Sequence, residues 1–302
     1  MRSVENLAKR RGWVRAVTTL PPRVLLALLR LQTWLTVAVG RRRKRRRDLA
    51  FFGSVRERAR IPDPAAAILR DHVMERLVGR AALIRVAAAP AGLDDPLLCV
   101  TGMEHVDAVL AEGRGCVLAG AHIGTAGLPA AVLARQGHTV LTLRRKELED
   151  RLDDEHGRLV FYGATPLWYG DDETAAALMK RCMKGLAENQ VVSYLVDGVL
   201  GERGVVVEVL GVPVFLRTGA MELARIARAP IIPAFGNVHD DRVLVEFCQP
   251  WRISSQEDVE AFAHHYARLF ADRVRRFPGN CTRRNMDQYI IQGRKAEFYA
   301  PR

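Results

Sequence analysis

The segment CVLAGAHIGTAGLPAAVLARQGHTVLTL, residues 116–143, predicts the fold of this chain. It has an apolar run at 116–120, a longer stretch at 127–137 that ends in a glycine, and a second apolar run at 139–143. Short apolar runs are typical of buried strands, whereas the longer stretch has the length and the glycine end of a helix. The segment therefore predicts a strand, a helix and a second strand.

The same alternation continues towards the C-terminus. The expected helices are residues 146–156, 173–189, 219–228 and 255–277. The expected strands are residues 191–197, 230–235 and 243–248, with two further extended segments at 205–210 and around 214. Strands that alternate with helices imply a largely parallel sheet covered by helices on both faces. The expected fold class is therefore α/β, preceded by a helical region at 48–95 with a loop at 61–64.

The composition indicates a folded protein with a polyanionic partner. Hydrophobic residues make up 49% of the 302 residues and charged residues 26%, which are ordinary values for a globular chain. The net charge of +12 is unusual and indicates nucleic acid, anionic phospholipid or an acidic protein as the partner. The five cysteines form no CxxC pair, which argues against a disulfide framework or a zinc site. Cys116 is better interpreted as a buried strand residue than as a nucleophile.

The N-terminal region points to a membrane surface. Residues 24–39 are mostly apolar but include Arg30, and the basic run GRRRKRRR follows at 40–47. This stretch is shorter than the roughly 20 apolar residues of a spanning helix, so we expect it to lie in the interface or insert shallowly. Basic residues flank it on both sides, so the positive-inside rule gives no crossing direction.

These features divide the chain into two expected parts. Residues 1–50 form a basic, membrane-associating segment, and residues 51–302 form a single α/β domain. The alternatives for the basic run are a nucleic-acid arm or a solvated tail. We expect an anionic membrane surface as partner and no nucleic acid, because the chain contains no nucleic-acid-binding motif. GVLGERG at 198–204 lacks the pattern of a phosphate-binding loop.

His122 is the first candidate catalytic residue. It follows the strand at 116–120, and reactive groups of parallel sheets lie in loops at the carboxyl ends of strands. A histidine is suited to general base catalysis because its ordinary pKa is close to neutral. To deprotonate an alcohol, its second ring nitrogen must bind a carboxylate or a carbonyl. A carboxylate five residues further on would lie near the ring, but that residue is Gly127.

The segment TGMEHVDAVLAEGRGCVLAGAHIGTAG, residues 101–127, resembles the active-site segment of the bacterial lipid A biosynthesis acyltransferases. The residues that match the family pattern here are Gly102, Glu104, Gly115, His122 and Gly124. The family's asparagine, tryptophan and acid are replaced by Thr125, Ala126 and Gly127. A second stretch, residues 191–235, resembles the family at Asp197, Gly211, Pro213, Phe215, Gly219, Leu223, Ala224, Pro230 and Pro233.

The resemblance implies a glycerolipid-acyltransferase-like α/β fold and a specific reaction. A fatty acyl chain would pass from acyl carrier protein or acyl-coenzyme A to a hydroxyl group of a membrane lipid or glycolipid, with His122 as the base. It implies no metal and no prosthetic cofactor. An acidic carrier protein and anionic lipids would account for the positive charge. The expected location is the cytoplasmic face of the bacterial cytoplasmic membrane.

The resemblance leaves the partner of His122 open. Asp197 ends the strand at 191–197 and would emerge at the same edge of a parallel sheet as His122, so it can replace the missing acid. Glu208 and Glu222 are weaker candidates, and a backbone carbonyl can also fix the tautomer. The residues expected to bind substrate are Gly124, Thr125, Arg144, Arg145, Arg217 and Gly219. Solvated arginines and a turn-capping role for Asp197 are the alternatives.

Gly127 also supports a different function. A homologue that has lost its catalytic acid could bind lipid or acyl carrier protein as an inactive scaffold or regulator. A hydrolase that cleaves acyl thioesters is a third possibility. The histidines without a partner at ligand spacing are expected to be non-catalytic: His105, His138, His239, His264 and His265.

Overall fold

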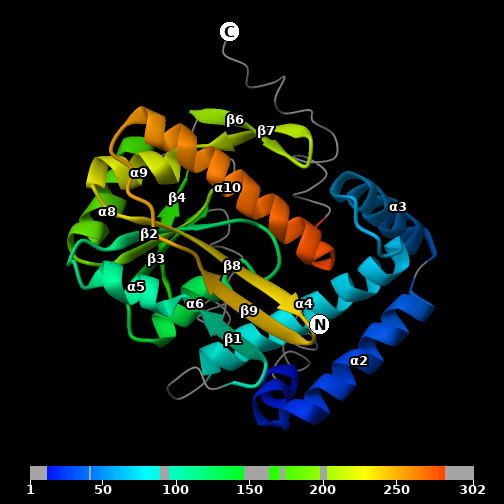
Figure 1. The fold of residues 1–302 in the computed structure, drawn as a ribbon. Coiled ribbons are helices and arrows are strands. Elements are labelled where there is room, and N and C mark those ends of the chain that lie inside the picture. The colour runs from blue at the N-terminus through cyan, green and yellow to red at the C-terminus, as the bar shows by residue number, and fades with distance from the viewer. Residues whose placement is uncertain are drawn as a thin grey trace.

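A computed structural model describes residues 12–40, 42–88, 95–145, 163–170, 174–197 and 203–282 (Figure 1). The strands of its large sheet are β1 (Leu98–Thr101), β2 (Cys116–Gly120), β3 (Val140–Arg145), β4 (Thr165–Tyr169), β5 (Val191–Leu195), β8 (Ile231–His239) and β9 (Arg242–Phe247). The helices are α2 (Pro22–Val39), α3 (Arg42–Ala59), α4 (Ala65–Ala88), α5 (Met103–Leu110), α6 (Leu128–Arg135), α8 (Ala175–Ala187), α9 (Gly219–Ala227), α10 (Gln256–Arg276) and the short 3-10 helix η2 (Pro278–Asn280).

The large sheet confirms the expected α/β class. Within the described residues its strand order is β1-β9-β8-β2-β5-β3-β4. All neighbouring strands are parallel except β8 and β9, which are antiparallel and joined by a turn at Asp240 and Asp241. Both turn residues have positive φ, as a tight hairpin turn requires. The short strands β1 and β4 were not expected from the sequence, and the helix expected at 146–156 lies outside the described residues.

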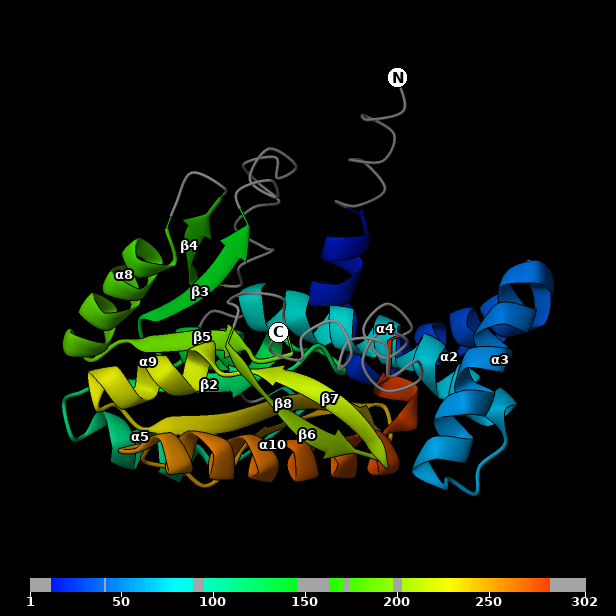
Figure 2. The ribbon, with the colours of Figure 1, turned by 90° about the horizontal axis from the view of Figure 1, so that it is seen from above.

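The central strands bury both faces. Along β2, Cys116 and Leu118 belong to the hydrophobic cluster that includes α4, α5 and α6. Val117 and Ala119 alternate with them and belong to the cluster that includes α8, α9 and α10. Successive side chains of a strand point to opposite faces, so a strand between two helical layers is apolar throughout. Figure 2 shows the sheet between α4 and α10.

A hairpin lies apart from the large sheet. Its strands β6 (Gly204–Val209) and β7 (Val212–Arg217) pair with each other and pack against α10 (Figure 1). The sequence predicted extended chain here but did not place it outside the sheet. The buried side chains of this hairpin face the segment that follows β2, as described below.

The apolar N-terminal stretch forms a helix that is held by the domain. Helix α2 is the one helix among the described residues that is long and apolar enough to cross a membrane, yet its Leu25 and Leu29 are buried. It packs against α4, and Arg30 forms an ion pair with Asp241 in the β8–β9 turn. The arginine inside the apolar stretch therefore ties α2 to the sheet.

The basic run 42–47 forms the first turns of α3. This helix continues to Ala59 and buries Phe51, Phe52 and Val55, so it crosses residue 50, where the two expected parts meet. The division at residue 50 stays a prediction.

Helix α4 has a notch at Gly79 that admits the loop following β2. A Cβ atom at Gly79 would lie 2.1 Å from Thr125 Oγ1 and 3.3 Å from Thr125 Cβ. A glycine inside a helix destabilises that helix by about 1 kcal/mol relative to an alanine. Its presence in α4 is explained by the close approach of Thr125.

We expect Gly79→Ala to destabilise the protein by about 1–3 kcal/mol, because the added methyl group overpacks the contact with Thr125. The matched control is Gly53→Ala in α3, where a Cβ atom meets nothing within 4 Å. That substitution should stabilise the protein by about 0.5–1 kcal/mol through helix propensity. Urea unfolding of both variants measures the difference, and equal effects of the two substitutions would contradict the role of the notch.

Candidate active site

Two polar residues follow adjacent parallel strands at one edge of the sheet. The register pairs Gly120, the last residue of β2, with Leu195, the last residue of β5. His122 and Asp197 each come two residues later. Because both strands run in the same direction, their next residues emerge side by side at the carboxyl edge of the sheet.

The structure brings His122 and Asp197 into direct contact. His122 Nδ1 lies 2.8 Å from one carboxylate oxygen of Asp197, and the main-chain N–H of His122 donates to the other at 2.8 Å. The side chain of His122 is 42% exposed, whereas that of Asp197 is 12% exposed. A carboxylate only accepts hydrogen bonds, so Nδ1 carries the proton, and in the neutral ring Nε2 carries the lone pair. The pair thus has the geometry of a base and its orienting acid.

The other candidate acids are placed differently. Glu222 on α9 forms an ion pair with Arg225 at 2.9 Å. Glu208 lies on β6, opposite Pro213 of the hairpin. Gly127 is the N-cap residue of α6 in a right-handed helical conformation and supplies no side chain. Of the carboxylates proposed from the sequence, Asp197 is therefore the one that contacts His122.

The loop between His122 and α6 is fixed by main-chain hydrogen bonds. Gly124 has a φ of 58° and donates its N–H to the main-chain oxygen of Asn280 at 2.9 Å. Thr125 donates its N–H to the main-chain oxygen of Gly236 in β8 at 2.7 Å. A Cβ atom at Gly124 would lie 2.3 Å from the main-chain oxygen of Gly236, so there is no room for a side chain. The positive φ of Gly124 would also strain the backbone of any other residue. The expected substrate-binding roles of Gly124 and Thr125 stay predictions.

Asn280 fastens this loop to the sheet. Its side chain is buried, and it binds both main-chain polar groups of Val238 in β8, accepting from the N–H at 2.7 Å and donating to the oxygen at 3.0 Å. The neighbouring Gly279 is bound in turn, because its main-chain oxygen lies 2.8 Å from His72 Nδ1 on α4. The turn at 278–281 thus connects α4, β8 and the loop after His122.

A buried carboxyl group lies behind the same loop and was not expected from the sequence. Glu75 on α4 is 5% exposed, and Thr125, whose hydroxyl it faces, is 7% exposed. The hydroxyl of Thr125 is buried and makes no hydrogen bond of normal geometry within the described residues. Burial raises the pKa of Glu75 to about 7, because desolvation disfavours the charged form more than Arg76 and Thr125 favour it.

The remaining predicted residues lie around the carboxyl edge and the hairpin. Arg144 and Arg145 end β3, in register with Trp168 and Tyr169 of β4. Arg217 ends β7, is buried, and places its guanidinium carbon 5.8 Å from the ring centre of Phe215.

Gly219 begins α9, where a Cβ atom would lie 2.6 Å from the hydroxyl of Tyr194 on β5. Burial raises the pKa of Tyr194 to about 12, and Arg217 acts in the opposite direction. The substrate-binding roles of Arg144, Arg145, Arg217 and Gly219 stay predictions.

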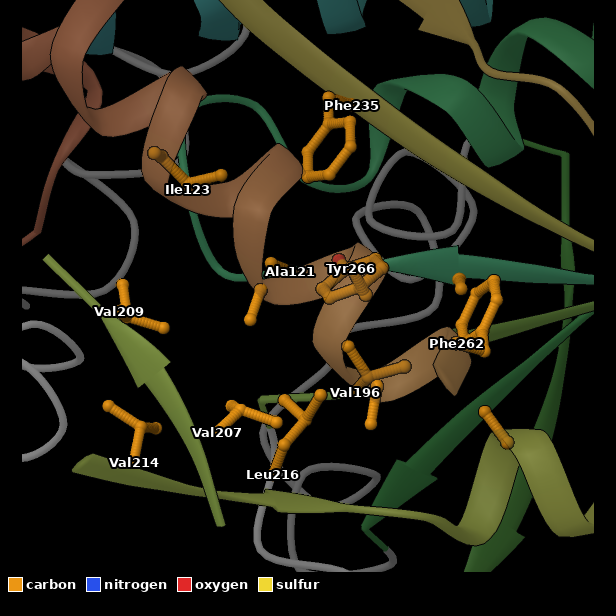
Figure 3. Close-up of a cluster of buried hydrophobic side chains, with 14 of the residues drawn as sticks. Ala121, Ile123, Val196, Val207, Val209, Val214, Leu216, Phe235, Phe262 and Tyr266 are labelled. Atoms are coloured by element: carbon orange, nitrogen blue, oxygen red, sulfur yellow. The ribbon is translucent and has the colours of Figure 1, made fainter. Parts of the chain in front are cut away.

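Apolar residues adjoin His122. Its chain neighbours Ala121 and Ile123 are buried in a cluster with Val196, the residue before Asp197. Figure 3 shows these side chains with those of Phe235, Phe262 and Tyr266 and with the inner face of the hairpin. The hairpin residues of this cluster are Val207, Val209, Val214 and Leu216. The hydrophobic core thus extends to the residues on either side of the histidine.

Other chemistries have less support. Cys116 is fully buried, and desolvation raises the pKa of its thiol to about 12, which is unsuited to a nucleophile. Within the part of the chain that the structure describes, no three His, Cys, Asp or Glu side chains are grouped so that they could hold a metal ion. The ring of His265 stacks on the ring of Trp251, with 4.9 Å between the ring centres. This contact is a packing contact, and the sequence suggested no catalytic role for His265.

Comparison with known proteins identifies a family. The family model of the bacterial lipid A biosynthesis acyltransferases matches residues 12–281, which is most of the chain. A search of curated proteins gives no match. The match includes α2, the His122–Asp197 pair and the turn at 278–281.

We expect Glu75→Gln to stabilise the protein in a pH-dependent way. The pKa of Glu75 is 4.5 in its ordinary state and about 7 in the folded protein, so the folded state loses stability as the pH rises between these values. Glutamine has the same shape and does not ionise. The gain in unfolding free energy should therefore grow by about 3 kcal/mol between pH 4 and pH 8. Urea unfolding across this range measures it, with the exposed Glu260→Gln on α10 as control, and a constant difference would contradict it.

Proposed function

The chain belongs to the bacterial lipid A biosynthesis acyltransferase family, and on this premise we propose that it transfers a fatty acyl chain from an acyl thioester to a hydroxyl group of a lipid or glycolipid. The thioester would be carried by acyl carrier protein or coenzyme A. The observation that carries the proposal is the contact between His122 Nδ1 and Asp197. It supplies a general base although the family's acid position is occupied by Gly127.

The proposed reaction is a direct acyl transfer. Nε2 of His122 accepts the proton of the acceptor hydroxyl while its oxygen attacks the thioester carbonyl. A carbon–oxygen bond forms, the carbon–sulfur bond breaks, and the departing thiolate takes the proton from the imidazolium. Asp197 holds the ring in the required tautomer and stabilises the imidazolium. Main-chain N–H groups or an arginine would stabilise the oxyanion.

The surroundings of His122 fit the two kinds of substrate. The apolar cluster formed by Ala121, Ile123, Val196 and the hairpin offers a lining for a hydrocarbon chain (Figure 3). Arg144, Arg145 and Arg217 would bind phosphate groups of the donor or acceptor, with Gly124, Thr125 and Gly219 lining the approach. Neither a metal nor a prosthetic group has a step in this scheme.

The position of α2 supports association with a membrane surface. The family is membrane-associated in bacteria, and the described part of this chain includes one apolar helix near its N-terminus that is long enough to cross a membrane. The exposed face of α2 carries Val24, Leu28, Leu31, Trp34, Leu35 and Val39. Leu25 and Leu29 on another face are buried. A helix with one face packed on a domain and one apolar face exposed can lie in the plane of the interface.

The basic start of α3 would strengthen this association. Residues 42–47 are all cations and follow the apolar face directly. Each cation near an anionic surface contributes on the order of 1 kcal/mol. We place this surface on the cytoplasmic face of the bacterial cytoplasmic membrane, where acyl thioesters are made.

A second candidate function rests on Gly127. Without the family's acid, the protein would be an inactive homologue that binds lipid or acyl carrier protein as a scaffold or regulator. The contact with Asp197 favours catalysis over this alternative, because it supplies the missing hydrogen-bond partner from a neighbouring strand.

His122→Ala and Asp197→Asn should each lower acyl transfer by about 10²–10⁴-fold, because one removes the base and the other its tautomer control. Transfer of a labelled acyl chain from acyl carrier protein into membrane lipids measures this. Glu222→Gln is the control, because Glu222 is paired with Arg225 and should leave transfer unchanged.

Unchanged transfer by His122→Ala would contradict the proposal. Lipid or carrier binding with no transfer by the folded wild-type protein would favour the scaffold. Release of free fatty acid without an acceptor would identify a hydrolase.

Trp34→Glu and Leu31→Glu should each weaken binding to anionic phospholipid vesicles by about tenfold or more, because each removes an exposed apolar side chain that would insert into the lipid interface and adds a negative charge. Flotation with vesicles of phosphatidylglycerol and phosphatidylethanolamine measures it. Ile226→Glu on α9 is the control, since Ile226 is similarly exposed but distant in sequence from α2. Binding should also weaken with salt, and a variant that binds like wild type would contradict the assignment of this face.

A further inference from the structure

We propose that Asn280 is a positioning residue of the His122 site: it holds Gly124 by its main-chain oxygen and β8 by its side-chain amide, and so keeps the ring of His122 where Asp197 binds it. This inference rests on the proposed function, because it assigns a role within the same site. The role is indirect, since Asn280 acts through Gly124, two residues after His122.

The loop after β2 is held at three successive points. His122 is bound by Asp197 through its ring and through its main-chain N–H, both at 2.8 Å. The N–H of Gly124 donates to the main-chain oxygen of Asn280 at 2.9 Å, and the N–H of Thr125 donates to the main chain of β8 at 2.7 Å. Release of Gly124 would therefore free the middle of a short segment to which the ring of His122 is attached.

Asn280 takes the place of a strand beside β8. Among the described residues, one isolated bridge at Gly124 follows the end of the pairing between β2 and β8. Further along β8, Val238 lies opposite Val243 of β9, but Val243 directs its N–H to Leu97, so the polar groups of this pair face away from each other. The side chain of Asn280 binds both groups of Val238, accepting from the N–H at 2.7 Å and donating to the oxygen at 3.0 Å.

This position requires an amide side chain. An asparagine carries one acceptor and one donor group side by side, as a peptide group does, whereas an ionised aspartate only accepts and an apolar side chain does neither. The side chain of Asn280 is 3% exposed, so water has little access to the groups that it binds. The amide thus fixes Asn280 to β8 through two bonds that few other side chains could make.

The turn that carries Asn280 is also held by α4. The main-chain oxygen of Gly279 lies 2.8 Å from His72 Nδ1. A Cβ atom at Gly279 would lie 2.9 Å from Asp71 Cβ and from the main-chain nitrogen of His72, so the turn lies directly on the helix. With α4 on one side and β8 on the other, the oxygen that binds Gly124 is a fixed point.

The experiment compares acyl transfer by wild type and by Asn280→Ala. The substitution removes both bonds to Val238, so the turn can move and Gly124 and the base move with it. A displacement of about 1 Å can lower a rate by about 10²-fold. We expect kcat to fall by about 10–10²-fold, with KM changed by less than about threefold, because Asn280 binds no substrate in this scheme.

Hydrogen exchange provides a readout that needs no acyl transfer. In Asn280→Ala, the protection of the Gly124 N–H should fall by about tenfold or more, while that of the Leu118 N–H within β2 changes little. A purely structural role would lower the protection of both. The Nδ1 proton of His122, observed by NMR, should exchange faster with water than in wild type, because the ring is held less firmly against Asp197.

Asn189 provides the matched control. Its amide also binds two main-chain groups, accepting from the N–H of Gly115 at 2.8 Å and donating to the oxygen of Leu110 at 3.1 Å. Gly115 precedes β2, so these bonds lie at the other end of that strand from His122. Asn189→Ala should lower the free energy of unfolding in urea but leave kcat and the protection of Gly124 as in wild type.

A second variant, Asn280→Asp, keeps the shape of the side chain and the bond from the Val238 N–H. Its carboxylate cannot donate to the Val238 oxygen, so kcat and the protection of Gly124 should change in the same direction as in Asn280→Ala. If Asn280→Ala does not fold, this variant decides the question.

The outcomes separate this inference from the proposed function. If His122→Ala abolishes transfer and the Asn280 variants keep the kcat of wild type, the role of Asn280 is wrong and the proposed function stands. If His122→Ala leaves transfer unchanged, the proposed function is wrong, and the exchange data at Gly124 and His122 alone decide whether Asn280 holds the ring. Wild-type protection of Gly124 in the Asn280 variants, or an equal loss at Leu118, would overturn the proposal.

Discussion

Parallel pairing of β2 with β5 is the constraint on which the site depends. It aligns Gly120 with Leu195, so the side chains two residues later emerge together. Both oxygens of Asp197 are then used, one by the ring of His122 and one by its main chain. A slip of one residue in either strand would turn one of these side chains to the other face. The side chains of β2 alternate between two hydrophobic clusters on opposite faces of the sheet, and this alternation disfavours such a slip.

Under the proposed function, this origin explains how catalysis can persist with Gly127 at the family's acid position. In the pattern of the family, the acid comes from the start of the helix that follows the histidine. Here the start of α6 contributes only backbone, and the acid comes from a neighbouring strand. The orientation of His122 is therefore a property of the sheet. The loop between β2 and α6 is held separately, by main-chain hydrogen bonds to β8 and to the turn at 278–281.

The elements that the sequence predicted best are those that begin in a buried apolar run. The run at 116–120 is apolar and buried throughout because both faces of the sheet are covered, so it is recognisable without knowledge of the partner strands. The run at 191–195 includes Ser193 and is fully buried at Val191 and Val192, and its apolar start was enough to predict a strand. The strand β4 was missed because TPLWY is short, begins with Thr and Pro and is only partly buried. The antiparallel direction of β9 depends on which strands pair, which no local pattern encodes.

The contact between His122 and Asp197 was predictable from the sequence, whereas the burial of Glu75 was not. His122 and Asp197 stand at strand ends, so a parallel sheet was enough to bring them together. Glu75 was missed because a glutamate within a helix rich in charge is ordinarily solvated, and its burial follows from packing between segments 50 residues apart in sequence. Gly79 was the available signal, since a glycine inside a helix indicates close approach of another group.

The attachment of α2 to the domain would fix the orientation of the molecule on the proposed membrane surface. Leu25 and Leu29 pack inward, and Arg30 is bound to Asp241, so the helix cannot pivot on a flexible tether. If the exposed face of α2 adsorbs to a bilayer, as proposed, the domain is held at one inclination and one height above the lipid. The distance from the lipid surface to His122 is then fixed as well, and it limits which acceptor headgroups can reach the ring.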